Sequence, residues 1–151
     1  MVQIFGYGTF ISLKLYENKG NVRPAFLPNY FRVLKPGLDF PFIIKDNGLY
    51  GSKSGFWGLV FEINNSELEN FDRYEGKGFL YDRITETVVY ADKSEDSVMT
   101  YYPREELISS YNLKKLIDLG DLWMAKIVED YPEIIKKYPD LARNDNPTKI
   151  I

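Results

Sequence analysis

Residues 2–10 read VQIFGYGTF, an apolar run that ends in two glycines around a tyrosine and is followed by a threonine. Short apolar runs bounded by glycine are typical of buried strands, so residues 2–7 predict a strand that leads directly into a loop. Three interpretations of this loop are possible. It is a cradle for phosphate, a tight turn with nothing bound, or a binding loop for another kind of substrate.

The common phosphate-binding motifs do not fit this loop. The dinucleotide fingerprint requires a third glycine at position 11, which is Ile11, and an acidic residue about 20 residues later in a strand–helix–strand unit. The P-loop requires a lysine after its last glycine, and no lysine stands at that spacing. Glycines also permit close approach, so backbone N–H groups around Tyr7–Phe10 can converge on an anionic oxygen. A turn that needs glycine only for its own shape remains the alternative.

Five or six strands are predicted from apolar or alternating patterns that turn residues interrupt. Pro28 is expected at a bulge or a sheet edge, and Gly58 indicates a bulge or a close approach of another backbone. The strands are expected at residues 2–7, 25–35, 40–44, 55–63, 81–91 and 98–103.

Helical patterns are fewer. Ser66 and Glu69 have the spacing of a capping box at the start of one helix, for which Gly76 is the predicted C′ residue. The apolar residues between 105 and 138 predict two further helices with a break near Gly120.

Together these elements predict a single α+β domain. The expected fold is a small mixed, mostly antiparallel, barrel-like sheet with an inserted helix and C-terminal helices, and with a helical turn near residues 12–17. Residues 1–103 are expected to form the barrel core and residues 104–139 a helical extension packed on the same domain. Residues 140–151 are expected to be a loose tail.

The composition of the 151 residues excludes several classes of protein. The net charge of −3 gives no basic face for nucleic acid, and no segment approaches the ~20 apolar residues of a membrane-spanning helix. The N-terminus lacks the pattern of a signal peptide, so a cytoplasmic location is expected. Aromatic residues make up 16% of the chain, which suits either a pocket wall or aromatic strands.

The sequence contains neither cysteine nor histidine. A thiol nucleophile, a thiolate metal site, an imidazole ligand and a Ser-His-Asp triad are therefore excluded. Acid–base chemistry near neutral pH must come from a carboxylate, a lysine or a tyrosine with a shifted pKa, or from substrate and water.

Glu75 is the carboxylate in the least ordinary place. It lies about 20° from Leu68 on the helical wheel, and therefore on the apolar face of the predicted helix. Burial there, and the negative end of the helix dipole, both raise the pKa of a carboxyl group. Arg73 and Lys77 would oppose this rise if they turned inward. In the alternative, the helix stops before Glu75, whose side chain then points to water or pairs with Lys77.

Taken in order, several segments resemble the γ-glutamylcyclotransferase-like superfamily, which includes the AIG2-like proteins and γ-glutamylamine cyclotransferase. The resemblance covers about residues 2–102. The segments that carry it are FGYGTF at 5–10, YFRVL at 30–34, DFPF at 39–42, GFWGLVFEI at 55–63, LENFDRYEG at 68–76 and YDR at 81–83.

The resemblance implies a mixed barrel in which Tyr7, Gly8, Thr9 and Phe10 bind a γ-glutamyl group and Glu75 is the catalytic acid and base. The substrate's α-amine would attack its own γ-carbonyl and release 5-oxoproline, so that neither a metal nor a cofactor is required. Leucine is more usual in the family at Phe10, and a larger apolar residue at position 6, which puts the size of the substrate in question.

The identity of the leaving amine is left open, and a monomer or a small homo-oligomer is expected. A non-catalytic module on the same fold, binding a small molecule or a protein partner, is the main alternative to the enzyme. A hydrolase that uses a water molecule activated by glutamate is a weaker one.

Overall fold

Five strands form a closed barrel in the computed structural model, which describes residues 1–48, 54–119 and 121–148. The order around the barrel is β1-β5-β2-β6-β7, and the barrel closes where β1 pairs with β7 in the parallel sense. The other ladders are antiparallel, so the predicted mixed, mostly antiparallel barrel is confirmed. The strands are β1 (Val2–Gly6), β2 (Gly20–Pro28), β5 (Gly55–Ile63), β6 (Tyr81–Val89) and β7 (Glu95–Pro103).

Two further strands, β3 (Tyr30–Val33) and β4 (Phe42–Lys45), form a separate antiparallel pair. The single strand predicted at residues 25–35 is therefore wrong, because the chain leaves the barrel between β2 and β3. Pro28 has no N–H for a ladder, and Asn29 has a φ of 69°, which turns the chain. The structure thus describes seven strands in these ranges, against the five or six predicted.

Helix α2 (Asn65–Tyr74) carries the predicted catalytic residue at its C-terminal end. Its N-cap is Asn64 and not Ser66: Asn64 Oδ1 accepts from Glu67 N at 2.8 Å, and Glu67 Oε1 accepts from Asn64 N at 3.1 Å. The predicted Gly76 stop is confirmed. Gly76 has a φ of 64° and its N–H donates to Arg73 O, while Lys77 N–H donates to Asp72 O, which is a Schellman motif.

The other helices are shorter than predicted. The first, α1 (Thr9–Ser12), begins three residues before the expected helical turn. The two helices predicted at residues 105–138 are instead four segments, and the predicted break at Gly120 lies outside the described residues. Asn112, with a φ of 52°, follows the first segment, and Pro132 begins the last. The segments are α3 (Glu105–Ser110), the 3₁₀ helix η2 (Leu113–Leu119), α4 (Leu122–Asp130) and α5 (Pro132–Lys137).

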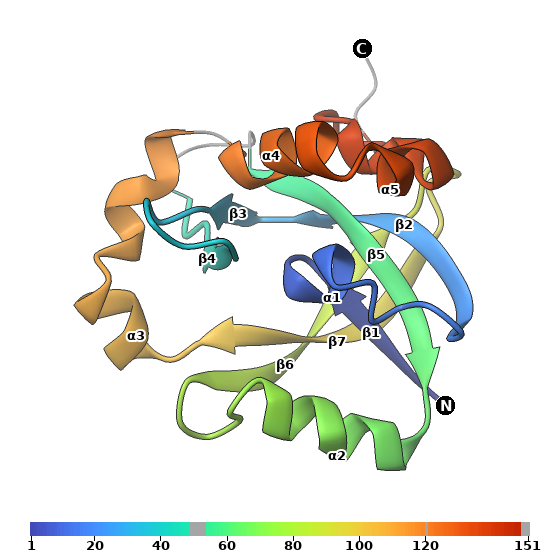
Figure 1. Cartoon of the computed structure of the whole chain (residues 1–151), viewed down its shortest axis with the longest axis horizontal. Coiled ribbons are helices and arrows are strands. Elements are labelled where there is room, and N and C mark those ends of the chain that lie inside the picture. Colours follow the sequence, from blue (N-terminus) through green and yellow to red (C-terminus); the bar gives the residue numbers. More distant parts are fainter. Residues whose placement is uncertain (49–53, 120, 149–151) are drawn as a thin grey trace.

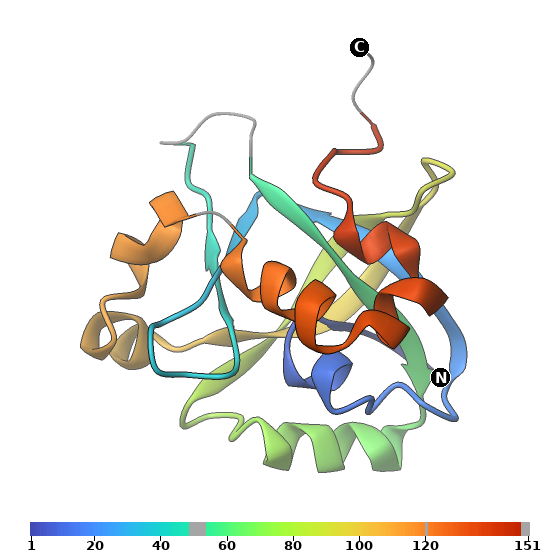
Figure 2. The same ribbon diagram turned by 45° about the horizontal axis from the view of Figure 1, so that its top comes forward.

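The helices cover opposite sides of the barrel. Figure 1 shows α2 along one side and α4 with α5 along the other, above β3 and β5, and the turned view in Figure 2 agrees. Alternate residues of the strands face two hydrophobic clusters. One draws on every barrel strand and includes Phe5, Leu27, Val60, Val88 and Val98. The other joins the barrel to the helices and includes Ile4, Phe10, Phe61, Trp123 and Leu141.

The segment that follows α5 packs on the barrel. It forms a 3₁₀ helix, η3 (Pro139–Ala142), in which Leu141 is completely buried. Trp57 Nε1 donates to Asp145 O at 3.0 Å, and the Arg143 guanidinium lies 4.6 Å from the centre of the Trp57 ring. The prediction of a loose tail is therefore wrong for residues 141–145.

In the ranges that the structure describes, no helix is both long enough and apolar enough to cross a membrane.

Candidate active site

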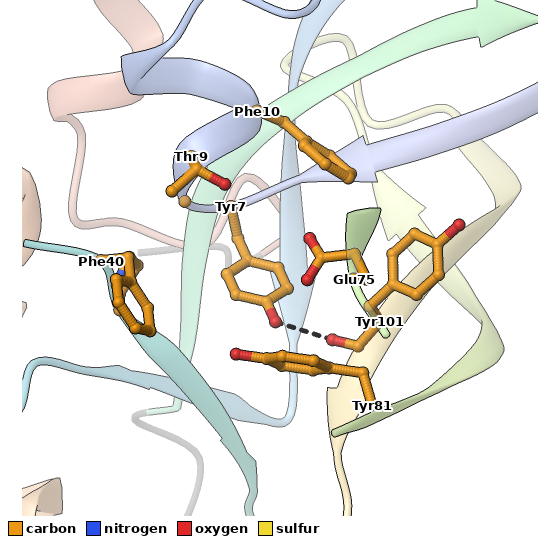
Figure 3. A pocket seen from close by; sticks show the side chains of 9 residues that line it. Tyr7, Thr9, Phe10, Phe40, Glu75, Tyr81 and Tyr101 are labelled. Carbon is orange, nitrogen blue, oxygen red and sulfur yellow. Dashed lines mark hydrogen bonds between the residues drawn. The ribbon is translucent and has the colours of Figure 1, made fainter. Parts of the chain in front are cut away.

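A cavity with about 350 Å³ of empty space opens beside the loop between β1 and α1. Part of this space is open to solvent. Its walls come from four parts of the chain that are distant in sequence, shown together in Figure 3. The lining residues are Tyr7, Gly8, Thr9, Phe10, Phe40, Pro41, Glu75, Tyr81 and Tyr101.

All five residues predicted for the site, Tyr7, Gly8, Thr9, Phe10 and Glu75, lie on this cavity. The structure therefore brings together the two segments that the sequence singled out, some 65 residues apart. The role of each of the five residues stays a prediction.

The glycine loop is shaped by a close neighbour. A Cβ atom on Gly8 would lie 2.9 Å from Pro41 Cδ, so glycine allows the two walls of the cavity to approach. Gly8 O accepts the N–H groups of Ile11 and Ser12, which begins α1. Within the described ranges, the N–H groups of Gly8, Thr9 and Phe10 have no hydrogen-bond acceptor. The residues that carry these three N–H groups line the cavity.

Tyr7 forms a wall of the cavity, but its hydroxyl group is already bound. Tyr7 Oη donates to the backbone carbonyl of Tyr101 at 2.7 Å, as the dashed line in Figure 3 shows. Burial raises the pKa of Tyr7 well above its ordinary value, and the nearby Tyr81 and Glu75 add to this. Tyr7 therefore remains protonated and fixes the position of the loop relative to β7.

Thr9 and Phe10 join the loop to the helix that carries Glu75. Tyr74 Oη donates to Thr9 Oγ1 at 3.2 Å, and the rings of Phe10 and Phe71 stack with their centres 4.9 Å apart. Phe10 is buried, so its ring serves mainly to pack α1 against α2. The loop and Glu75 are thus held in a fixed relation by contacts between two neighbouring elements.

Glu75 is the C-cap residue of α2, one position beyond the last regular helical residue. Its side chain is partly buried, and Figure 3 shows its carboxylate pointing into the cavity. Burial raises the pKa of Glu75 from 4.5 to about 7. In the described ranges the carboxylate has no ion-pair partner, and Arg73 turns away to Asn70. The helix does end before Glu75, as the alternative supposed, yet the side chain faces the cavity and does not pair with Lys77.

Two tyrosines complete the site. Tyr101 Oη donates to Asp72 Oδ1 at 2.7 Å, and Asp72 also pairs with Arg83, so the Tyr101 hydroxyl is occupied. The Tyr81 hydroxyl has no hydrogen bond to any residue that the structure describes. Burial raises the pKa of Tyr81 well above its ordinary value, with a smaller contribution from Glu75. The hydroxyl group therefore stays protonated and can donate a hydrogen bond. The sequence predicts no role for Tyr81 beyond its place in the YDR segment.

Glu75 is the only one of the nine lining residues whose side chain can carry a charge near neutral pH. Within the described ranges no group of three or more carboxylates is arranged to hold a metal ion. The chemistry that this cavity can offer from its own residues is therefore one carboxyl group, a tyrosine hydroxyl and a set of backbone N–H donors.

A family model described as "Gamma-glutamyl cyclotransferase, AIG2-like" matches residues 4–125 of the chain. No curated protein matches the sequence. Among solved structures, the solution structure of an Arabidopsis thaliana protein is 25% identical with a TM-score of 0.54, covering 90% of this chain and 91% of that one.

Two further solved structures share the fold at lower identity. One, described as a gamma-glutamyl cyclotransferase, is 20% identical with a TM-score of 0.53 and covers 99% of this chain and 93% of that one. The other, an AIG2-like protein from Mus musculus, is 17% identical with a TM-score of 0.53 and covers 72% of this chain and 82% of that one.

Proposed function

Because the chain belongs to the AIG2-like family of γ-glutamyl cyclotransferases, we propose that it converts a γ-glutamyl amide to 5-oxoproline and a free amine or amino acid. The observation that carries this proposal is the partly buried carboxyl of Glu75, with a pKa of about 7, on the same cavity as residues Gly8–Phe10, whose backbone N–H groups have no acceptor among the described residues. A carboxyl group with such a pKa can accept and return a proton at neutral pH.

The proposed reaction needs no nucleophile from the protein. The α-amine of the γ-glutamyl group attacks its own γ-carbonyl, which forms the lactam C–N bond and breaks the bond from the γ-carbon to the leaving nitrogen. The α-ammonium group loses two protons in total, and the leaving amine gains two, so no external acid or base is consumed. Glu75 takes a proton from the α-amine and delivers it to the leaving nitrogen. The reaction involves no oxidation or reduction.

The shape of the cavity supplies the other part of catalysis. Holding the substrate in a folded conformation, with amine and carbonyl in contact, can be worth roughly 7–11 kcal/mol for a well-oriented intramolecular attack. In this proposal the N–H groups of Gly8, Thr9 and Phe10 donate to carboxylate or carbonyl oxygens of the γ-glutamyl group, which is supported by their lack of an acceptor among the described residues and by the position of these residues on the cavity. Fixed donors of this kind contribute a few kcal/mol when they face developing negative charge. The Tyr81 hydroxyl is a further candidate donor to the same group.

The direct test is incubation of the protein with a panel of γ-glutamyl amino acids and γ-glutamyl-ε-lysine, followed by detection of 5-oxoproline. Release of 5-oxoproline from at least one of them supports the proposal. Failure with every member, although 5-oxoproline itself binds, would favour a non-catalytic binding module on the same fold. Release of free glutamate in place of 5-oxoproline would indicate a hydrolase.

The pH dependence of the reaction follows from the pKa of Glu75. We expect kcat/KM to rise with pH and to reach half its plateau near pH 7, because Glu75 must be ionised to accept a proton and burial raises its pKa to about 7. Initial rates at low substrate concentration, measured from about pH 5 to about pH 9, locate this midpoint. A midpoint near pH 4, where an ordinary carboxyl group titrates, would contradict this assignment.

The narrow contact between Gly8 and Pro41 gives a second prediction. Gly8→Ala places a methyl group 2.9 Å from Pro41 Cδ, so the loop and the Phe40–Pro41 wall must separate. We expect the affinity for 5-oxoproline, measured by calorimetry, to fall by about tenfold or more, since small displacements of binding groups have large effects. Gly20→Ala is the matched control, because its Cβ would meet nothing closer than 3.5 Å. Equal affinities in the two variants would show that the Gly8 contact does not shape the site.

A further inference from the structure

Arg32, in the middle of β3, is a buried charge that the proposed mechanism does not use. Its side chain is 1% exposed, which is rare for arginine unless its charge is paired and its N–H groups are bonded. The guanidinium lies over two aromatic rings, 4.5 Å from the centre of Phe56 and 5.0 Å from that of Trp123. Because this side chain is fixed by its contacts, it can couple the positions of the elements that it contacts.

One side of the guanidinium is bound to the start of α4. Arg32 Nε donates to Asp121 Oδ1 at 3.0 Å and Arg32 Nη2 donates to Asp121 Oδ2 at 2.6 Å, a bidentate pair across 89 residues of sequence. Asp121 is also the N-cap of α4, where Oδ1 accepts from Met124 N at 3.3 Å. The orientation of Arg32 is therefore fixed by a carboxylate that also begins a helix.

The remaining contact of the guanidinium is with the glycine loop. Arg32 Nη1 donates to the backbone carbonyl of Tyr7 at 3.1 Å. That carbonyl belongs to the peptide unit whose N–H is Gly8 N–H, one of the three free donors on the cavity. A cationic donor on the oxygen of a peptide polarises the unit, which strengthens its N–H as a donor, and it also fixes the plane of the peptide.

The start of α4 also supports the opposite wall of the cavity. Trp123 Nε1 donates to Asp39 O at 3.2 Å, directly before the lining residues Phe40 and Pro41. The same turn of α4 thus contacts the loop through Arg32 and the facing wall through Trp123. The start of α4 is therefore linked by hydrogen bonds to both of these walls.

We propose that Arg32 is a positioning residue, which holds the Tyr7–Gly8 peptide so that Gly8 N–H donates to the bound γ-glutamyl group, and that Asp121 fixes Arg32 for this purpose. The effect on turnover rests on the proposed cyclotransferase function. The effect on the Gly8 peptide does not, because it is a property of the protein without substrate.

The test compares Arg32→Lys and Asp121→Asn with Arg143→Lys. Lysine keeps the charge but cannot donate to Asp121 and Tyr7 in the geometry of the fork, and asparagine keeps the N-cap of α4 without the charge. Arg143 is the matched control, since it also forms a bidentate pair with an aspartate, Asp145, and lies over a tryptophan, but does not touch the cavity.

Two readouts are measured. The first is the ¹⁵N resonance of Gly8 in the protein without ligand, which reports on hydrogen bonding to the preceding carbonyl. The second is kcat and KM for 5-oxoproline release at a temperature where all variants are folded. We expect Arg32→Lys to move the Gly8 resonance and to lower kcat/KM by between about ten- and a hundredfold, with Arg143→Lys near wild type in both. Adding Asp121→Asn to Arg32→Lys should change the Gly8 resonance and kcat/KM little further, because the two residues act through the same contact.

An unchanged Gly8 resonance in Arg32→Lys, or an equal loss of kcat/KM in Arg32→Lys and Arg143→Lys, would overturn the proposal. If the wild-type protein releases no 5-oxoproline from any substrate, the proposed function fails, and the Gly8 resonance alone then decides whether Arg32 holds the peptide.

Discussion

Glu75→Gln is expected to lower kcat for 5-oxoproline release by about 10²–10⁴-fold, the usual contribution of a positioned general acid or base. Glutamine has nearly the same shape, but it cannot accept a proton from the α-amine and return it to the leaving nitrogen. Glu75 is the only one of the nine cavity residues that can carry a charge near neutral pH, so none of the others can readily replace it. The measurement is single-turnover release of 5-oxoproline from the best substrate of the panel.

The control for this variant is Glu69→Gln, which removes an exposed carboxylate from the same helix and should leave the rate unchanged. Binding of 5-oxoproline to Glu75→Gln, measured by calorimetry, shows that the cavity is intact. If product formation survives in Glu75→Gln at close to the wild-type rate, the proposed mechanism is wrong even though the substrate class is right.

Local signals in the sequence predicted much of the fold. The strand at residues 55–63 and the helix stop at Gly76 follow from a glycine-bounded apolar run and from the left-handed conformation that a helix C-terminus favours. The helix start was wrong by two residues, because Asn64 and Glu67 have the same capping-box spacing as Ser66 and Glu69. Spacing alone does not distinguish two overlapping boxes.

The errors farther along the chain have a different cause. The turn at Asn29, and the packing of Leu141 and Arg143 on the barrel, depend on tertiary contacts that no local pattern reports. A short polar segment after a proline resembles a loose tail unless the ring of Trp57 is known to lie beneath it. The sequence thus predicted the elements better than it predicted where they end.

The same difference between local patterns and tertiary contacts applies to the candidate site. The loop and Glu75 were found because each is unusual in its own segment: two glycines after a strand, and a carboxylate on an apolar helix face. Tyr81 and Pro41 were missed since an aromatic residue or a proline in such places is ordinary until the cavity is seen. Arg32 was missed because its partners, Tyr7 and Asp121, lie 25 and 89 residues away.

The raised pKa of Glu75 has a cost in the stability of the folded protein. The pKa of Glu75 in the folded protein is about 7, against 4.5 as its ordinary value, so folding favours the protonated form. Below about pH 4.5 the group is protonated in both states and this cost is absent. Between about pH 4.5 and pH 7 the unfolded chain ionises Glu75 more readily than the folded protein does, so stability falls as the pH rises and levels off above about pH 7.

The variant that loses activity should therefore be more stable than the wild type at alkaline pH. We expect Glu75→Gln to raise the free energy of unfolding by about 1–3 kcal/mol at pH 8, and the gain to vanish near pH 4, where Glu75 is itself neutral. Urea unfolding of both proteins at each pH measures the difference. Glu69→Gln, on the exposed face of α2, should change stability by no more than about 0.5 kcal/mol at either pH. An equal effect of Glu75→Gln at pH 4 and pH 8 would mean that the carboxyl of Glu75 is ionised as easily in the folded protein as in water.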